Sequence, residues 1–151
     1  MLNKKTDLPR GSKKLIRAWT FYDWANSVYS LVISSAIFPI YYSTHVFSDV
    51  NSILIFSLDI NKDTLISLLS GLCFLVIAFL SPMLSGIADY IGNKKIFMKF
   101  FVYMGSISCI SLYWFELENI EISLLLYFLS LLGFWGSLVY YNSYLNDITF
   151  P

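Results

Sequence analysis

The chain has 151 residues, of which 57% are hydrophobic and 13% are charged, and its formal net charge is zero. Soluble domains have about 45–50% apolar and about 25% charged residues, so a mean hydropathy of +0.65 indicates a membrane protein. A balanced charge gives no basic field that would hold nucleic acid, and two cysteines are too few for a disulfide scaffold.

Four stretches are long and apolar enough to cross the hydrocarbon core of a bilayer, which takes about 20 residues as a helix. In chain order they are residues 19–42, 65–87, 96–115 and 122–145. The first contains one charge, Asp23, the third contains Lys99, and the other two contain none. We therefore predict an all-α integral membrane protein with four transmembrane helices in an antiparallel bundle.

Lysine and arginine are distributed unequally between the two sides of these helices. Six of the ten precede the first span, three lie between residues 94 and 99, and one, Lys62, lies in the first loop. Cytoplasmic loops carry the excess of basic residues, so both termini are predicted to be cytoplasmic in a multi-pass protein of the bacterial inner membrane. Residues 1–18 are then a basic cytoplasmic segment. A cleaved signal peptide is disfavoured, because its apolar core has only about 7–15 residues.

The first loop, residues 43–64, contains an apolar run at 53–58 that is too short to span a membrane. An interfacial segment, a short strand and a short helix all fit this run. His45, in the same loop, has no second metal ligand within reach, and no catalytic or cofactor-binding motif is present. We expect no metal, no cofactor and no enzymatic activity, and we expect Cys73 and Cys109 to act as small packing residues.

The first span contains a line of polar residues. Asp23, Asn26, Ser30 and Ser34 are separated by three, four and four residues, which places them on one face of a helix. An ionisable group inside a span is costly and usually faces protein or water. Two interpretations are equally supported: Asp23 pairs with Arg17 or caps the helix start, or this face belongs to a transport pathway or gate.

The end of the second span combines small, acidic and basic residues. Ser85 and Asp89 share a helix face with Pro82, which is expected to kink the helix because it lacks a backbone donor. Gly92 and the pair Lys94–Lys95 follow. A charge cluster with neighbouring helix ends is one interpretation, and a solvated basic loop is the other, which these residues alone favour.

The fourth span presents small residues and tyrosines on one face. Gly133 and Ser137 have the spacing that allows two membrane helices to approach closely. Tyr140, Tyr144 and Asp147 continue the same face. Buried tyrosine hydroxyls need partners, so this face is predicted to line the interior of the bundle, although an aromatic belt at the membrane interface explains some of the tyrosines equally well.

Residues 85–95 resemble the loop between helices two and three of major facilitator superfamily transporters, which reads G-x-x-x-D-x-x-G-[RK]-[RK]-[RK]. Asp89, Gly92, Lys94 and Lys95 match this pattern, whereas Ser85 replaces its first glycine and an asparagine replaces its first cation. Three further segments resemble the vacuole-effluxer-like branch of that superfamily: Tyr-Asp-Trp-Ala-Asn-Ser at 22–27, Phe-Pro-Ile-Tyr-Tyr at 38–42 and Gly-Ser-Leu-Val-Tyr-Tyr-Asn at 136–142.

This resemblance implies a transporter that binds a small solute between two six-helix halves and works by alternating access. The branch includes permeases of unknown substrate and an amino-acid effluxer, so amino acids are a candidate substrate class. The resemblance implies a transport pathway or gate at Tyr22, Asp23, Asn26 and Asn142. It also implies a cytoplasmic loop motif at Ser85, Asp89, Gly92, Lys94 and Lys95.

The chain ends after the fourth predicted helix, where such transporters have about twelve. We interpret it as the N-terminal portion of a longer reading frame, a truncated gene, or a chain whose missing part another chain or another copy supplies. Membrane lipid and a small solute are the other expected partners, and nucleic acid is not one. The alternative function is that of a self-sufficient four-helix protein, either a dimeric small exporter or a structural or inert remnant.

Overall fold

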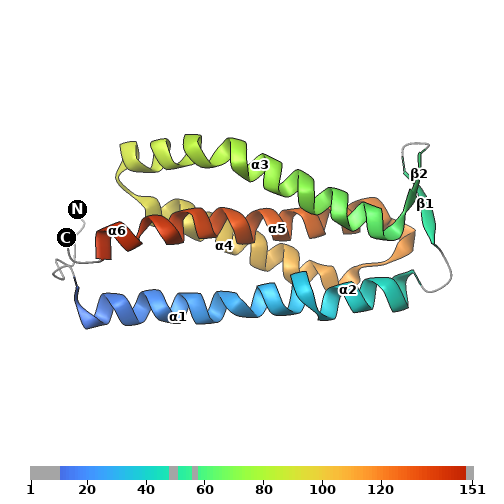
Figure 1. Cartoon of the computed structure of the whole chain (residues 1–151), viewed down its shortest axis with the longest axis horizontal. Helices are drawn as coiled ribbons and strands as arrows, with labels where there is room; N and C mark the ends of the chain where they lie inside the picture. The colour runs from blue at the N-terminus through green and yellow to red at the C-terminus, as the bar shows by residue number, and fades with distance from the viewer. Residues whose placement is uncertain (1–10, 48–50, 56–57, 149–151) are drawn as a thin grey trace.

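The computed structural model describes residues 11–47, 51–55 and 58–148, which form a long helical bundle (Figure 1). A first helical run comprises α1 (Lys13–Tyr29), the π-helical turn η1 (Ser30–Ser35), α2 (Ile37–Tyr41) and the π-helical turn η2 (Tyr42–Val46). It is followed by the strands β1 (Ser52–Ile55) and β2 (Leu58–Asn61) and by the helix α3 (Lys62–Ile91). The chain then forms α4 (Lys94–Ser111), the 3-10 turns η3 (Leu112–Trp114) and η4 (Leu117–Asn119), α5 (Ile120–Ser143) and α6 (Leu145–Ile148).

The predicted all-α membrane architecture is confirmed, and the structure adds a break in the first span and a short hairpin after it. Within the described ranges, three stretches are long and apolar enough to cross a membrane: 62–87, 94–114 and 117–143. The first predicted span, 19–42, is also helical, but it is interrupted at Ala36, where the backbone leaves helical geometry (φ −128°, ψ −75°). Of the loop segment at 53–58, which the sequence left undecided, the described residues 53–55 and 58 belong to an antiparallel hairpin that pairs Ile53 with Ile60.

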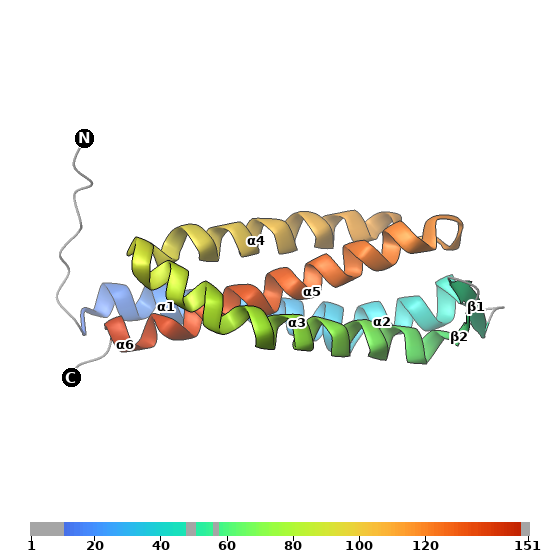
Figure 2. The same ribbon diagram turned by 90° about the horizontal axis from the view of Figure 1, so that it is seen from above.

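Helix α5 is the centre of the bundle. Helices α1 and α3 lie on opposite sides of it in Figure 1, and α4 covers another side in Figure 2. The closest approach is between α4 and α5, where a Cβ atom added to Gly133 would lie 2.5 Å from the backbone nitrogen of Gly105. Helix α3 contains Pro82 and bends in its C-terminal part (Figure 2).

The two ends of the bundle differ in charge. The starts of α1 and α4 lie at one end, here called the basic end, which carries Lys13, Lys14, Arg17, Lys94, Lys95 and Lys99. The hairpin and the connection from α4 to α5 lie at the other, here called the acidic end, which carries Asp59, Asp63, Glu116, Glu118 and Glu121 together with Lys62.

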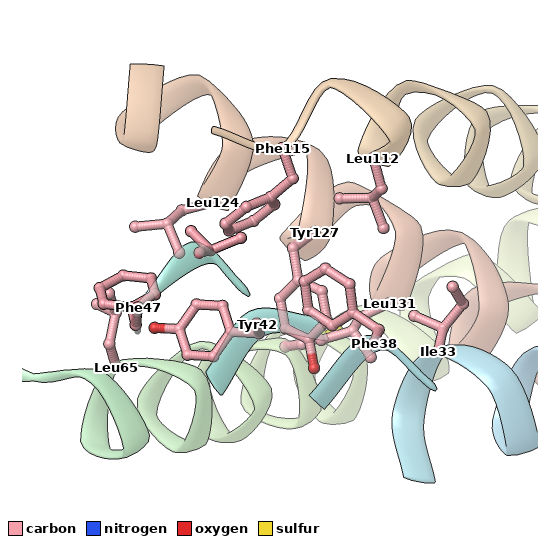
Figure 3. Close-up of a cluster of buried hydrophobic side chains, with 12 residues drawn as sticks. Ile33, Phe38, Tyr42, Phe47, Leu65, Leu112, Phe115, Leu124, Tyr127 and Leu131 are labelled. Atoms are coloured by element: carbon pink, nitrogen blue, oxygen red, sulfur yellow. The ribbon is translucent and has the colours of Figure 1, made fainter. Parts of the chain in front are cut away.

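The main core lies towards the acidic end (Figure 3). Its aromatic centre consists of Phe38 and Tyr42 of the first helical run, Phe115, and Tyr127 of α5. Phe38 stacks on Tyr127 with a centroid separation of 4.9 Å and meets Phe115 edge-on at 5.4 Å. A second and much smaller cluster, centred on Phe101 and Tyr140, lies nearer the basic end. Packing is therefore dense at the acidic end and sparse at the basic end.

Candidate functional site

The face of α1 that carries Asp23 is not covered by the rest of the described chain. Asp23 and Ser34 are exposed, and Ser30 is half-buried. Ser27, which the sequence reasoning missed although it lies four residues after Asp23, is exposed on the same side of the helix. Its hydroxyl donates to the backbone carbonyl of Asp23 at 2.8 Å. Asp23, Ser27, Ser30 and Ser34 lie on one side of α1 and η1 and are here called the polar band.

The apolar face of α1 is uncovered as well. Phe21, Trp24, Val28 and Leu31 are all exposed, and they recur at the three- and four-residue spacing of one helix face. Helix α1 therefore presents two uncovered bands, one apolar and one polar. An apolar band can face lipid, but a band that contains a carboxylate requires water or protein.

Arg17 and Asp23 are both described by the structure and form no ion pair, because no contact within 4.0 Å joins them. The Asp23 carboxylate is instead an electrostatic neighbour of the Tyr141 hydroxyl on α5. The Tyr141 ring stacks on Trp19 with a centroid separation of 4.6 Å, and its hydroxyl donates to the Trp19 carbonyl at 3.4 Å. Asp23 is thus placed beside the contact between α1 and α5 near the basic end.

Two tyrosine–serine pairs continue this contact along the helices. The Tyr22 hydroxyl donates to Oγ of Ser137 at 3.0 Å. About two helical turns further along α1, the hydroxyls of Tyr29 and Ser130 lie 2.9 Å apart. Both tyrosines and both serines are seven residues apart, so the antiparallel helices pair them in order. This equal spacing is the sequence signal that could have identified Tyr29 and Ser130, which were missed.

A cavity of about 400 Å³ opens between α1, α4 and α5. Tyr22, Asn26 and Tyr29 line it from α1, and Ser130 and Ser137 line it from α5. The α4 side contributes small and apolar groups, namely Phe101, Val102, Gly105, Ser106, Cys109 and Ile110. No charged side chain lines this cavity. Its polar groups are hydroxyls and one amide, which suit hydrogen bonding to a small uncharged group.

The structure brings together two of the four predicted pathway residues. Tyr22 and Asn26 line the cavity, whereas Asp23 lies on the exposed polar band of α1. Asn142 is exposed near the end of α5 and does not line the cavity. The described residues also contain no group of three histidine, cysteine or acidic side chains that could hold a metal ion.

The predicted loop motif lies at the turn from α3 to α4. Gly92 has φ +68°, a left-handed conformation that favours glycine, and it reverses the chain between the two helices. Ser85 is half-buried in α3, and Lys94 and Lys95 begin α4. The side chain of Asp89 lies outside the described part of the chain, so its place in this motif stays a prediction.

Comparison with known proteins identifies similar sequences. A family profile described as "Vacuole effluxer Atg22 like" matches residues 11–149. A protein of Bacillus subtilis (strain 168) named "Uncharacterized MFS-type transporter YxiO" is 36% identical over 133 residues, which make up 87% of this chain and 29% of that protein. The chain therefore spans less than a third of the length of this relative. No solved structure matches the chain.

Proposed function

This chain belongs to the vacuole effluxer Atg22-like family, and from that premise we propose that it supplies the first helices of a secondary transporter. The transporter moves a small solute across the membrane by alternating access, and amino acids are the candidate substrate class. Because the matched relative is much longer, the proposal concerns this chain together with further helices, whether they come from the same polypeptide, another chain or another copy.

The observation that carries the proposal is the uncovered polar band of α1, from Asp23 to Ser34. A helix that faced only lipid would be apolar on every exposed side, because an unmet polar group in hydrocarbon costs several kcal/mol. The adjacent face of α1 is apolar, and its exposed residues include Trp24 and Leu31. A helix that lies between lipid and an aqueous pathway requires one apolar face and one polar face, and α1 has both.

The proposal assigns a role to each predicted site residue. Asp23 faces the pathway from α1, and Asn142 faces it from α5. Tyr22 and Asn26 line the uncharged cavity beside the pathway and hydrogen-bond the solute there. The loop motif formed by Ser85, Asp89, Gly92, Lys94 and Lys95 acts as a gate at the basic end.

The charge asymmetry supports one orientation. Six described cations lie at the basic end, and five described carboxylates lie at the acidic end with one cation. Because basic residues accumulate on the cytoplasmic side, the basic end with both termini faces the cytoplasm. The apolar surfaces of α1, α3 and α4 contact membrane lipid, and the membrane is the bacterial inner membrane.

Cysteine labelling tests the pathway directly. In a Cys73→Ala/Cys109→Ala background, Ser27→Cys and Ser30→Cys introduce thiols on the polar band, and Val28→Cys and Leu31→Cys introduce them on the apolar band. The chain is reconstituted in lipid vesicles as part of the complete transporter and treated with a water-soluble maleimide. Thiolates form only where water reaches them, so the polar-band thiols are expected to react at least ten-fold faster.

The two apolar-band variants are matched controls, because they lie on the same helix and their residues are exposed in the same structure. Equal rates on both bands would show that the polar band does not face water, and this would contradict the proposed pathway. Fast reaction on the apolar band alone would place the aqueous surface on the wrong side of α1 and would contradict it too.

A further inference from the structure

The first helical run changes character at Ala36. On its acidic-end side, Phe38 is 5% exposed, Tyr42 2% and Phe47 0%, and all three belong to the main core. On its basic-end side, Ile33 of η1 still belongs to the main core, whereas α1 contains no buried residue over its 17 residues. One continuous stretch of chain is thus embedded in the bundle at one end and rests on the surface at the other.

The backbone between these two parts departs from a regular α-helix. In η1, hydrogen bonds run to the fifth preceding residue, as from the Ala36 amide to the Leu31 carbonyl at 3.0 Å. Pro39 follows and has no N–H with which to continue the ladder across Ala36. Single π-helical turns within helices are frequent at functional sites and are among the places where helices kink.

The acidic-end part is tied to the neighbouring helix by polar contacts in addition to its core packing. The Lys62 ammonium group, at the start of α3, donates to the Phe47 carbonyl at 3.1 Å and to the Ser43 carbonyl at 3.4 Å. In return, the Tyr42 hydroxyl donates to the Lys62 carbonyl at 2.9 Å. The end of the first helical run and the start of α3 therefore each donate hydrogen bonds to the other.

The basic-end part contacts the bundle through a few side chains and through one backbone hydrogen bond just before α1, in which the Gly11 amide donates to the Ile148 carbonyl of α6 at 2.8 Å. Trp19, Tyr22 and Tyr29 reach across to α5 and form ring contacts and hydrogen bonds with it. The cavity of about 400 Å³ lies along the same face of α1. Movement of α1 relative to α4 and α5 would change the size of this space, and it requires exchange of the three side-chain contacts and adjustment of the Gly11–Ile148 hydrogen bond.

We propose that residues 30–36 form a hinge about which α1 swings relative to α4 and α5, while α2 and η2 stay fixed to the rest of the bundle. Hinge motions of this kind are absorbed by a few residues at the ends of elements. The swing changes the size of the cavity and moves Asp23 relative to Tyr141. The proposal goes beyond the proposed function, because it concerns motion of the chain itself, and its test needs no solute.

Two spin-label pairs test the hinge in the background without native cysteines, in lipid nanodiscs that each hold one copy of the chain. The first pair, Ala18→Cys with Lys99→Cys, joins α1 and α4 at the basic end. The second pair, Thr44→Cys with Glu121→Cys, joins η2 and α5 at the acidic end. All four positions are exposed. The expected result is a broad or two-peaked distance distribution for the first pair and a single narrow peak for the second.

A proline substitution tests where the hinge lies. Pro39→Ala restores a backbone donor three residues after Ala36 and is expected to narrow the distance distribution of the first pair. Pro82→Ala is the matched control, because it restores a donor in α3 instead and is expected to leave that distribution unchanged. The second pair, measured in each variant, reports whether the bundle remains folded.

Three results would overturn the proposal. A first-pair distribution in the native sequence as narrow as that of the second pair would show that α1 does not swing. Narrowing by Pro82→Ala but not by Pro39→Ala would place the flexible point in α3. An unchanged, broad first-pair distribution in the folded Pro39→Ala variant would show that the motion does not depend on the irregular backbone at residues 30–36.

Discussion

Single hydroxyl groups determine how α1 is held against α5. Ser137 donates to the Phe134 carbonyl at 2.8 Å and accepts from the Tyr22 hydroxyl. When the Tyr22 hydroxyl is removed, the Ser137 hydroxyl therefore still has its own acceptor, and every buried donor at this site stays satisfied. The cost of such a change is that of one interhelical hydrogen bond, without the larger penalty of an unmet polar group.

Tyr22→Phe is accordingly expected to destabilise the bundle by about 0.6 kcal/mol, the mean for hydrogen bonds between membrane helices. The measurement is unfolding by increasing SDS in mixed micelles. A double-mutant cycle with Ser137→Ala isolates the pair, and its coupling energy should have the same size. Tyr113→Phe, at a residue that is 83% exposed, is the control. A coupling energy of zero would show that this hydrogen bond does not hold α1.

The sequence predicted which residues share a helix face but not what covers that face. Tyr22 and Asn26 were identified as site residues and line the cavity, whereas Asp23 and Asn142 do not line it. The difference depends on how α1 is rotated relative to α4 and α5. That rotation is set by the rings of Trp19, Tyr22 and Tyr29, whose partners lie more than 100 residues away in the chain.

At the scale of elements, the contact between α4 and α5 is the tightest in the bundle. A Cβ atom on Gly133 would lie 2.5 Å from the Gly105 nitrogen and 2.8 Å from the Phe101 carbonyl oxygen, both of them backbone atoms. Backbone atoms cannot rotate away as a side chain can. Gly71, in contrast, has nothing within 4 Å of the corresponding position.

We expect Gly133→Ala to separate α4 from α5 and to destabilise the bundle by about 1–3 kcal/mol, the usual range for overpacking. Gly71→Ala is the matched control in a helix and should be neutral or stabilising by up to about 1 kcal/mol, because alanine is the better helix former. The same SDS titration measures both variants. Equal stability of the two variants would show that the Gly105–Gly133 approach carries no packing energy.

The long helices were predictable because hydropathy and length alone identify a membrane span. The interruption near Ala36 could have been expected from Pro39, because a proline disturbs the helical turn that precedes it. The π-helical geometry of η1 could not, because η1 itself contains no glycine or proline. The hairpin could not be chosen in advance either. Its apolar run is short, and periodicity does not separate a short strand from a short helix; the pairing of Ile53 with Ile60 and their packing on the core decide the outcome.

At the scale of the whole molecule, the bundle is closed at the acidic end and incomplete towards the basic end. The motifs at 22–27 and 136–142 were sufficient to recognise the family, and the profile match over residues 11–149 confirms it. The described chain nevertheless leaves polar groups unmet. Tyr140 is 1% exposed and its hydroxyl has no hydrogen-bond partner within the described chain, and the polar band of α1 is uncovered.

These unmet groups lead to a prediction for the isolated chain. Insertion into a membrane depends on the hydropathy of the spans and on the flanking cations, and both are present in this chain. Stable association of helices in lipid depends instead on close packing and satisfied polar contacts. The 151-residue chain, expressed alone, is therefore expected to insert, to self-associate as a mixture of sizes in mild detergent, and to give no saturable solute flux in proteoliposomes.

Size-exclusion chromatography with light scattering measures the association, and uptake of a panel of amino acids and cationic drugs measures the flux. Asp23→Asn removes the carboxylate from the polar band, and Asp59→Asn, at an exposed residue of the acidic end, is the control for a lost charge. Saturable flux from a discrete dimer that disappears in Asp23→Asn but persists in Asp59→Asn would contradict the prediction. It would show that two copies suffice to form the pathway, because the polar bands of two α1 helices would then cover each other, and it would favour the small dimeric exporter over a chain that requires further helices.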